Sequence, residues 1–257
     1  SYWQTLAEAN DPDENKVYEE LIGKLSDQEK TQAAYWDIYH SENCQIGTPV
    51  WQFMLAHLPE LRANNGTEKV DRFLAGNYMD KLEEYILGYN NEHTVPFETL
   101  ARDIPTLGVA QQENLNRMLE LADLVYYKKV KELAKLIKKG IPDMSLAELQ
   151  TYAFGFRGIA WGLEEGETLP KGYAKAGKQL AALALTRMEG QADNLSAQDL
   201  ELGNLILSGF LSEEDPESYA RMANLIEQAL PRLPEDKAKK MLQYTLEDYK
   251  KMMNKKQ

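Results

Sequence analysis

Two histidines and a lone cysteine near the N-terminal end of the chain could bind a metal or form a nucleophile–base pair. His40 and Cys44 are four residues apart, so on an α-helix they would share a face and could both reach one Zn²⁺. Glu42 lies between them, and His57 follows in the same region. A thiol in contact with an imidazole is also the reacting pair of cysteine hydrolases. An enzyme or metal-binding protein that uses His40, Cys44 and His57 is therefore one hypothesis.

The rest of the sequence completes neither kind of site. Structural zinc sites take four ligands, and Cys44 is the only cysteine. The chain contains no His-Glu-x-x-His, no Gly-x-Ser-x-Gly and no glycine-rich phosphate loop between a strand and a helix. We therefore favour a protein that is not an enzyme and uses no metal or other cofactor. In that interpretation, residues 35–57 form an aromatic core seam and a surface loop.

A second group of residues favours binding over catalysis. Residues 159–170 read IAWGLEEGETLP and residues 206–217 read ILSGFLSEEDPE, so a glycine among apolar residues is twice followed by an acidic loop. In a repeat, equivalent loops lie along one edge, where their carboxylates could dock a basic partner. Trp161 precedes the first loop, and tryptophan is a frequent interface anchor. The predicted partner-binding residues are Trp161, Glu164, Glu165, Glu167, Glu213, Glu214 and Asp215.

Helix signals recur along the chain, whereas we find no sustained alternation of β-branched residues that would indicate strands. Ser26 and Ser145 are each followed three residues later by glutamate, the form of a capping box, and Ser196 by Asp199. We expect an all-α fold. The predicted helices are near residues 12–24, 27–43, 49–63, 67–89, 96–103, 108–139, 146–164, 171–189, 197–211, 216–230 and 235–253.

A helix-loop-helix pattern occurs twice in the C-terminal half. Aligning Gly162 with Gly209 also aligns Ala176 with Ala223. Helix pairs that bury their faces against neighbouring pairs are the building principle of α-solenoids. We therefore predict antiparallel helix pairs, α-solenoid-like at least in the C-terminal half. The expected division is an acidic helical N-terminal region, 1–105, and a helical-pair region, 106–257.

The run Leu202-Gly203-x-x-Ile206-x-x-Gly209 resembles the first helix of tetratricopeptide and Sel1-like repeats. Those families pair a Leu-Gly-x-x-Tyr type first helix with an alanine-rich second helix, and Ala223 falls in the helix that follows here. The resemblance covers about one repeat length closely and residues 145–254 more loosely. It departs at Ile206, which replaces the usual aromatic residue. The resemblance implies stacked helix pairs.

The net charge of −12 is concentrated in the first part of the chain. Residues 1–105 carry 19 acidic and 8 basic side chains, whereas residues 106–257 carry 22 and 21. The negative electrostatic field of this acidic region repels nucleic acid and anionic lipid and speeds the encounter with a basic protein. No window approaches the ~18 uninterrupted apolar residues of a membrane-spanning helix. We therefore expect neither nucleic-acid binding nor membrane insertion.

These observations predict a non-enzymatic protein that binds another, basic protein. An inhibitor or bacterial immunity protein that covers a basic toxin or effector site fits the charge pattern, and an adaptor or assembly factor is the alternative. The chain opens Ser-Tyr-Trp without an initiator methionine, as it would after removal of a leader or after trimming. We expect an exported or periplasmic protein, with a cytoplasmic one as the alternative. The oligomeric state is not indicated.

Overall fold

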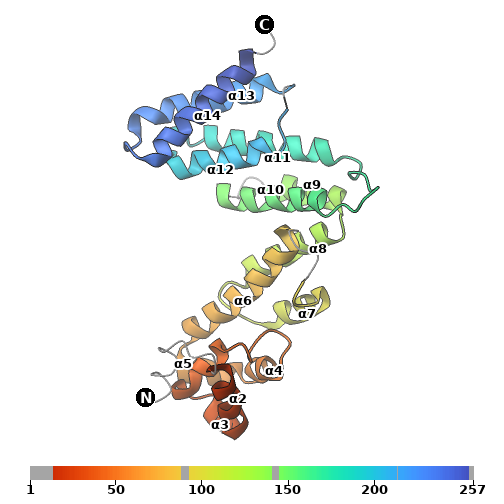
Figure 1. The fold of residues 1–257 in the computed structure, drawn as a ribbon, viewed down its shortest axis with the longest axis vertical. Coiled ribbons are helices and arrows are strands. Elements are labelled where there is room, and N and C mark those ends of the chain that lie inside the picture. The colour runs from red at the N-terminus through yellow and green to blue at the C-terminus, as the bar shows by residue number, and fades with distance from the viewer. Residues whose placement is uncertain (1–13, 88–92, 141–144, 213, 255–257) are drawn as a thin grey trace. The chain divides into compact units, whose positions relative to one another are not determined.

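In the computed structural model, the described residues are 14–87, 93–140, 145–212 and 214–254, and every regular element in these ranges is a helix (Figure 1). The predicted all-α class is confirmed. No helix of the described ranges is long and apolar enough to cross a membrane. The described residues form two compact units, unit 1 within 1–84 and 92–120 and unit 2 within 85–91 and 121–257. This division falls within two helices, not at the change of charge near residue 105.

Unit 1 contains short helices and irregular turns. The predicted helix 27–43 is a four-residue α-helix followed by a separate 3₁₀ helix, and the predicted helix 49–63 is broken at His57. Pro59 explains the second break, because proline lacks an N–H and clashes with the preceding turn. The elements are α2 Glu14–Lys24, α3 Asp27–Lys30, η1 Ala33–His40, α4 Pro49–Ala56, α5 Leu58–Asn65, α6 Thr67–Leu87, α7 Phe97–Asp103, η2 Ile104–Thr106 and the first part of α8 Gln112–Tyr126.

A chain of buried hydrogen bonds connects three helices of unit 1. The indole Nε1 of Trp51 donates to the hydroxyl of Tyr78, 2.9 Å away. That hydroxyl donates to Oδ2 of Asp103 at 2.9 Å, and Nε of Arg102 donates to Oδ1 of the same carboxylate at 2.7 Å. Buried polar groups are costly unless they are paired, so these bonds specify how α4, α6 and α7 meet.

A second polar contact holds the segment that leads into α8. Arg62 of α5 pairs with Asp71 of α6 at 2.8 Å and donates to the carbonyl of Leu107 at 3.0 Å. The other oxygen of Asp71 accepts from the backbone N–H of Ala110 at 3.1 Å. The backbone groups of this non-helical segment therefore find their partners on side chains of α5 and α6.

Unit 2 consists of helix pairs. Its helices lie in two layers: α10, α12 and α14 contact one another in order, and α9, α11 and α13 do the same (Figure 1). Because each helix from α10 to α13 also contacts the next along the chain, the predicted antiparallel, solenoid-like pairs are confirmed. The elements are α9 Val130–Gly140, α10 Leu146–Trp161, α11 Tyr173–Glu189, η4 Ala192–Asn194, α12 Ala197–Ser208, α13 Pro216–Ala229, η5 Leu230–Arg232 and α14 Lys237–Asn254.

Glycines let the helices of unit 2 approach closely. A Cβ on Gly158 of α10 would lie 2.5 Å from the carbonyl oxygen of Ile86, closer than any real contact. Gly177 of α11 is covered by the ring of Phe210, and Gly203 of α12 by the thioether of Met188. Gly158 therefore brings α10 against the backbone of Ile86, whereas Gly177 and Gly203 leave room for the side chains of Phe210 and Met188.

The long helix predicted over residues 108–139 is two helices. α8 ends at Tyr126 and α9 begins at Val130, and Lys128 between them has a φ of +53°. The backbone N–H of Lys129 reaches back five residues to the carbonyl of Leu124 at 2.8 Å, which closes the turn. No glycine or proline marks the break in the sequence.

Candidate functional site

Exposed aromatic side chains occur where α8 and α10 end. Tyr126 is 43% exposed, Tyr127 50% and Trp161 45%. Tyr126 meets Tyr127 edge-on at 4.9 Å between ring centroids, and its other side meets Tyr85 at 5.1 Å. We call Tyr126, Tyr127 and Trp161 the aromatic corner.

The helix contacts of unit 2 place the end of α10, which carries Trp161, beside the end of α8. Gly158, one turn before Trp161, lies against Ile86 and Val125. Those two residues are the sequence neighbours of Tyr85 and Tyr126. The end of α10 therefore lies beside the end of α8, and the aromatic corner is formed by helix ends whose positions are set by close backbone contact.

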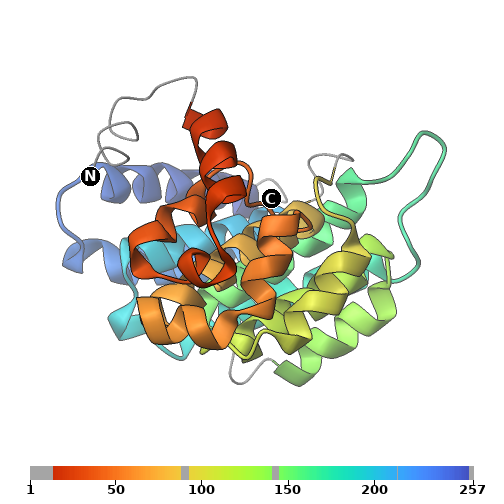
Figure 2. The same ribbon diagram turned by 90° about the horizontal axis from the view of Figure 1, so that it is seen from below.

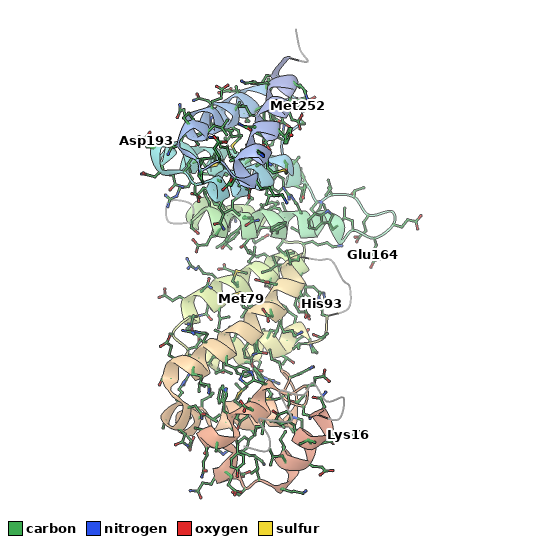
Figure 3. The ribbon with its side chains drawn as sticks, turned by 60° about the vertical axis from the view of Figure 1, so that its left-hand side comes forward. Lys16, Met79, His93, Glu164, Asp193 and Met252 are labelled. Atoms are coloured by element: carbon green, nitrogen blue, oxygen red, sulfur yellow. The ribbon has the colours of Figure 1, made fainter. Side chains whose placement is uncertain are left out.

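The loop of residues 162–172 extends away from the ends of α10 and α11 (Figures 1 and 2). Glu167 attaches it to the turn after α8: one carboxylate oxygen accepts from Lys128 at 2.6 Å and from the backbone N–H of Glu164 at 3.0 Å. These two bonds, that of Lys128 first, lower the pKa of Glu167. Glu164 and Glu165 are exposed, and Figure 3 labels Glu164 on the projecting loop.

The loop between α12 and α13 is held in the same manner. Asp215 accepts from the backbone N–H of Ser212 at 2.9 Å and pairs with Lys178 of α11 at 3.1 Å. Burial alone would raise the pKa of Asp215, but the bonds from Ser212 and Lys178 outweigh it and lower the pKa. Glu214 is exposed, and Glu213 lies outside the described residues.

One loop joins α10 to α11 and the other joins α12 to α13. Because α10 and α12 share one layer and α11 and α13 share the other, the two loops lie at the same edge of unit 2. Two of the carboxylates of the predicted ridge are used internally. Glu167 and Asp215 each bind a backbone N–H three residues earlier and a lysine of a preceding element. Of the predicted carboxylates that the structure describes, those of Glu164, Glu165 and Glu214 are exposed and have no such internal role.

His40 and Cys44 do not lie on one helix face. η1 ends at His40, and Ser41 is extended, so the i, i+4 relationship that suggested a shared metal is absent. Cys44 is buried, and burial raises the pKa of its thiol to about 12. A thiol with such a pKa is a poor nucleophile and a poor metal ligand at neutral pH.

His57 makes local contacts. Its Nδ1 is 2.9 Å from the carbonyl oxygen of Phe53, and the two rings stack with centroids 4.0 Å apart. Within the part of the chain that the structure describes, no three histidine, cysteine, aspartate or glutamate residues are placed to hold a metal ion. The hypothesis of an enzyme or metal site from His40, Cys44 and His57 therefore gains no geometric support.

Some residues of this site were not predicted. Lys128 and Lys178, which hold the loops, have no local sequence signal, because their partners lie far along the chain. Tyr127 had a local sequence signal, because it follows Tyr126 directly and two consecutive residues of a helix do not face the same side. The structure exposes both rings.

No family model, curated protein or solved structure matches this chain. The resemblance to tetratricopeptide and Sel1-like repeats therefore stays a prediction.

Proposed function

We propose that this chain is a non-enzymatic protein that binds another protein through the aromatic corner and the adjacent carboxylates of Glu164 and Glu165. The observation that carries the proposal is the exposure of Tyr126, Tyr127 and Trp161 on helix ends of unit 2. Large aromatic residues supply most of the binding energy at many protein interfaces, and a rigid support reduces the entropy lost on binding.

The expected partner presents arginine or lysine next to an apolar side chain. The face of Tyr127 already accepts a cation within the molecule, since Nζ of Lys129 lies 5.0 Å from its ring centroid. Glu164 and Glu165 add negative charge on the loop beside the rings. An inhibitor or immunity protein would cover such a segment on a toxin or effector, whereas an adaptor would use it as a docking segment.

The test uses capture from the lysate of the native organism with matched baits. The wild-type chain is compared with Tyr127→Ala/Trp161→Ala and with a control, Met241→Ala/Tyr244→Ala. Met241 and Tyr244 lie on α14 and are 52% and 64% exposed, so the control removes a similar amount of exposed apolar surface elsewhere. We expect the first variant to capture at least about tenfold less of one specific protein than the wild type does. The control should capture as much of that protein as the wild type.

A further pair of substitutions tests the charge. Glu164→Gln/Glu165→Gln is expected to slow association with the captured protein and to reduce the dependence of that rate on salt, with little change in dissociation. Equal loss of binding by the α14 control would contradict the proposal. So would a wild-type bait that retains no protein but carries a stoichiometric small molecule or metal after purification.

A further inference from the structure

Unit 1 contains a cavity of about 570 Å³ that the proposed function does not use. Three aromatic rings, those of Trp36, His40 and Phe73, form its wall. Glu68, Lys69 and Arg72, exposed residues of the first turns of α6, form its rim. The volume falls within the range of about 300–1,000 Å³ that is usual for small-molecule sites.

The aromatic wall is fixed by one hydrogen bond and two edge-on ring contacts. Nε1 of Trp36 donates to Nε2 of His40 at 2.9 Å. The rings of Trp36 and His40 both meet Phe73 edge-on, with centroids 5.5 Å and 4.8 Å away. Because an indole N–H can only donate, Nε2 of His40 is the unprotonated nitrogen and Nδ1 carries the proton. Burial lowers the pKa of His40, which keeps the ring neutral at neutral pH.

Positive charge at the rim is only partly compensated. Nζ of Lys69 lies 4.9 Å from the ring centroid of Trp36, and no carboxylate among the described residues pairs with it. Arg72 pairs with Glu68, but the two side chains are 75% and 82% exposed, and such surface pairs contribute little. A carboxylate that entered the cavity could therefore bind Lys69 directly and compete with Glu68 for Arg72.

We propose that this cavity binds a small planar aromatic carboxylate. The aryl ring would lie against Trp36 and Phe73, and the carboxylate would accept from Lys69 and Arg72. A single negative charge suits the site better than a polyphosphate, because residues 1–105 carry 19 acidic against 8 basic side chains and repel multiply charged anions. The ligand would enter between the aromatic wall and the lysine that now covers Trp36.

The experiment titrates the full chain with 2-naphthoate and follows binding by calorimetry and by amide chemical shifts. Two matched probes separate the contributions. 2-Naphthamide keeps the planar ring without the charge, and decahydro-2-naphthoate keeps the charge without the planar ring. We expect 2-naphthoate to bind at least about tenfold more tightly than either probe, with shifts at the first turns of α6 and in η1.

Lys69→Met tests the charge contact with little risk to folding, because Lys69 is an exposed residue. It should weaken 2-naphthoate about five- to tenfold and leave 2-naphthamide unchanged. The control is Lys24→Met on α2, a lysine with a 76% exposed side chain that does not line the cavity. Phe73→Leu should weaken both aromatic probes.

Three results would overturn the inference. They are the absence of saturable 2-naphthoate binding, equal binding of 2-naphthoate by Lys69→Met and the wild type, and equal loss in the Lys24→Met control. Because every residue involved lies in unit 1, the outcome is independent of the partner-capture test on the aromatic corner.

Discussion

Unit 1 and unit 2 are both helical, but different contacts hold them together. Of the buried polar or charged residues among those described, Thr31, Ser41, Asp71 and Asp103 lie in unit 1 and Lys239 in unit 2. In unit 2, by contrast, helices touch at glycines whose space a neighbour fills. One unit depends on specific polar partners and the other on close apposition of helices.

The difference follows from how each unit pairs its backbone N–H and C=O groups. A regular helix pairs its own N–H and C=O groups except at its ends, so the pairs of unit 2 need only fit one another. The turns and 3₁₀ segments of unit 1 leave more of these groups without local partners. Side chains such as Arg62 and Asp71 bind them instead.

The largest expected effect is on unit 2, from Gly158→Val. Its added atoms would meet the carbonyl of Ile86, and the expected cost is about 3 kcal/mol of local stability. Hydrogen exchange measured by mass spectrometry should show faster exchange in α10 and its neighbours. Gly76→Ala is the control, since no atom lies within 4 Å of a Cβ there, and it should stabilise α6 by about 0.5–1 kcal/mol. A neutral Gly158→Val would refute close helix contact as the basis of unit 2.

Tyr78→Phe should have the next largest effect, on unit 1. It leaves the Trp51 N–H and one oxygen of Asp103 without their buried partner, at an expected cost of about 2 kcal/mol. Tyr39→Phe is the matched change, because that hydroxyl makes one bond, to the carbonyl of Lys30 at 2.8 Å, and its loss should cost about 1 kcal/mol. Urea denaturation compares the two variants. Equal costs would mean that the chain of bonds adds nothing beyond a single bond.

The thiol of Cys44 can report on unit 1 alone, because it is the only cysteine in the chain. Burial raises its pKa to about 12, so a disulfide reagent should modify the native protein at least about 100-fold more slowly than the unfolded chain. Tyr78→Phe should speed the native reaction about tenfold, and Gly158→Val should not change it. If Gly158→Val speeds the reaction as much, the two units open together and the comparison between them fails.

The smallest expected effect is on the stability of unit 2 at acid pH, through its two loops. The folded-state pKa values of Glu167 and Asp215 are both lowered, so their contribution to stability is complete above the ordinary carboxyl range. This contribution to stability is lost as the pH falls below about 4, the ordinary carboxyl pKa, and then through the lowered folded-state pKa values. Glu167→Gln/Asp215→Asn should therefore flatten the dependence of the thermal midpoint on pH between about pH 5 and 3. An unchanged pH profile would show that the two ion pairs contribute nothing to stability.

Much of the fold could be predicted from local signals. The capping boxes at Ser26, Ser145 and Ser196 form as expected, and each marks the start of a helix. The helix pairs follow from the repeated glycine pattern. The break at Lys128 could not be predicted, because nothing in Tyr-Tyr-Lys-Lys opposes a helix and the side chain of Lys128 pairs with Glu167, far along the chain.

The candidate site was predicted less completely, because its chemistry depends on long-range pairing. The exposure of Trp161 and Glu164 agrees with the expected binding edge. Glu167 looked the same as Glu164 in the sequence, but its carboxylate binds Lys128, 39 residues earlier. The cavity beside Trp36 combines η1 with the first turns of α6, and no sequence pattern links those two segments.

The glycines covered by Phe210 and Met188 also limit where extra helices could be inserted into the chain. Phe210 fits the space left by Gly177, and Met188 the space left by Gly203, so the interface between α11 and α12 is matched at two glycines. An extra pair inserted between α11 and α12 would separate Met188 from its glycine, whereas consensus repeats tolerate such duplication because their interfaces are interchangeable. An insertion at the junction of α11 and α12 would therefore disturb these contacts, whereas helices added beyond α14 would leave them in place.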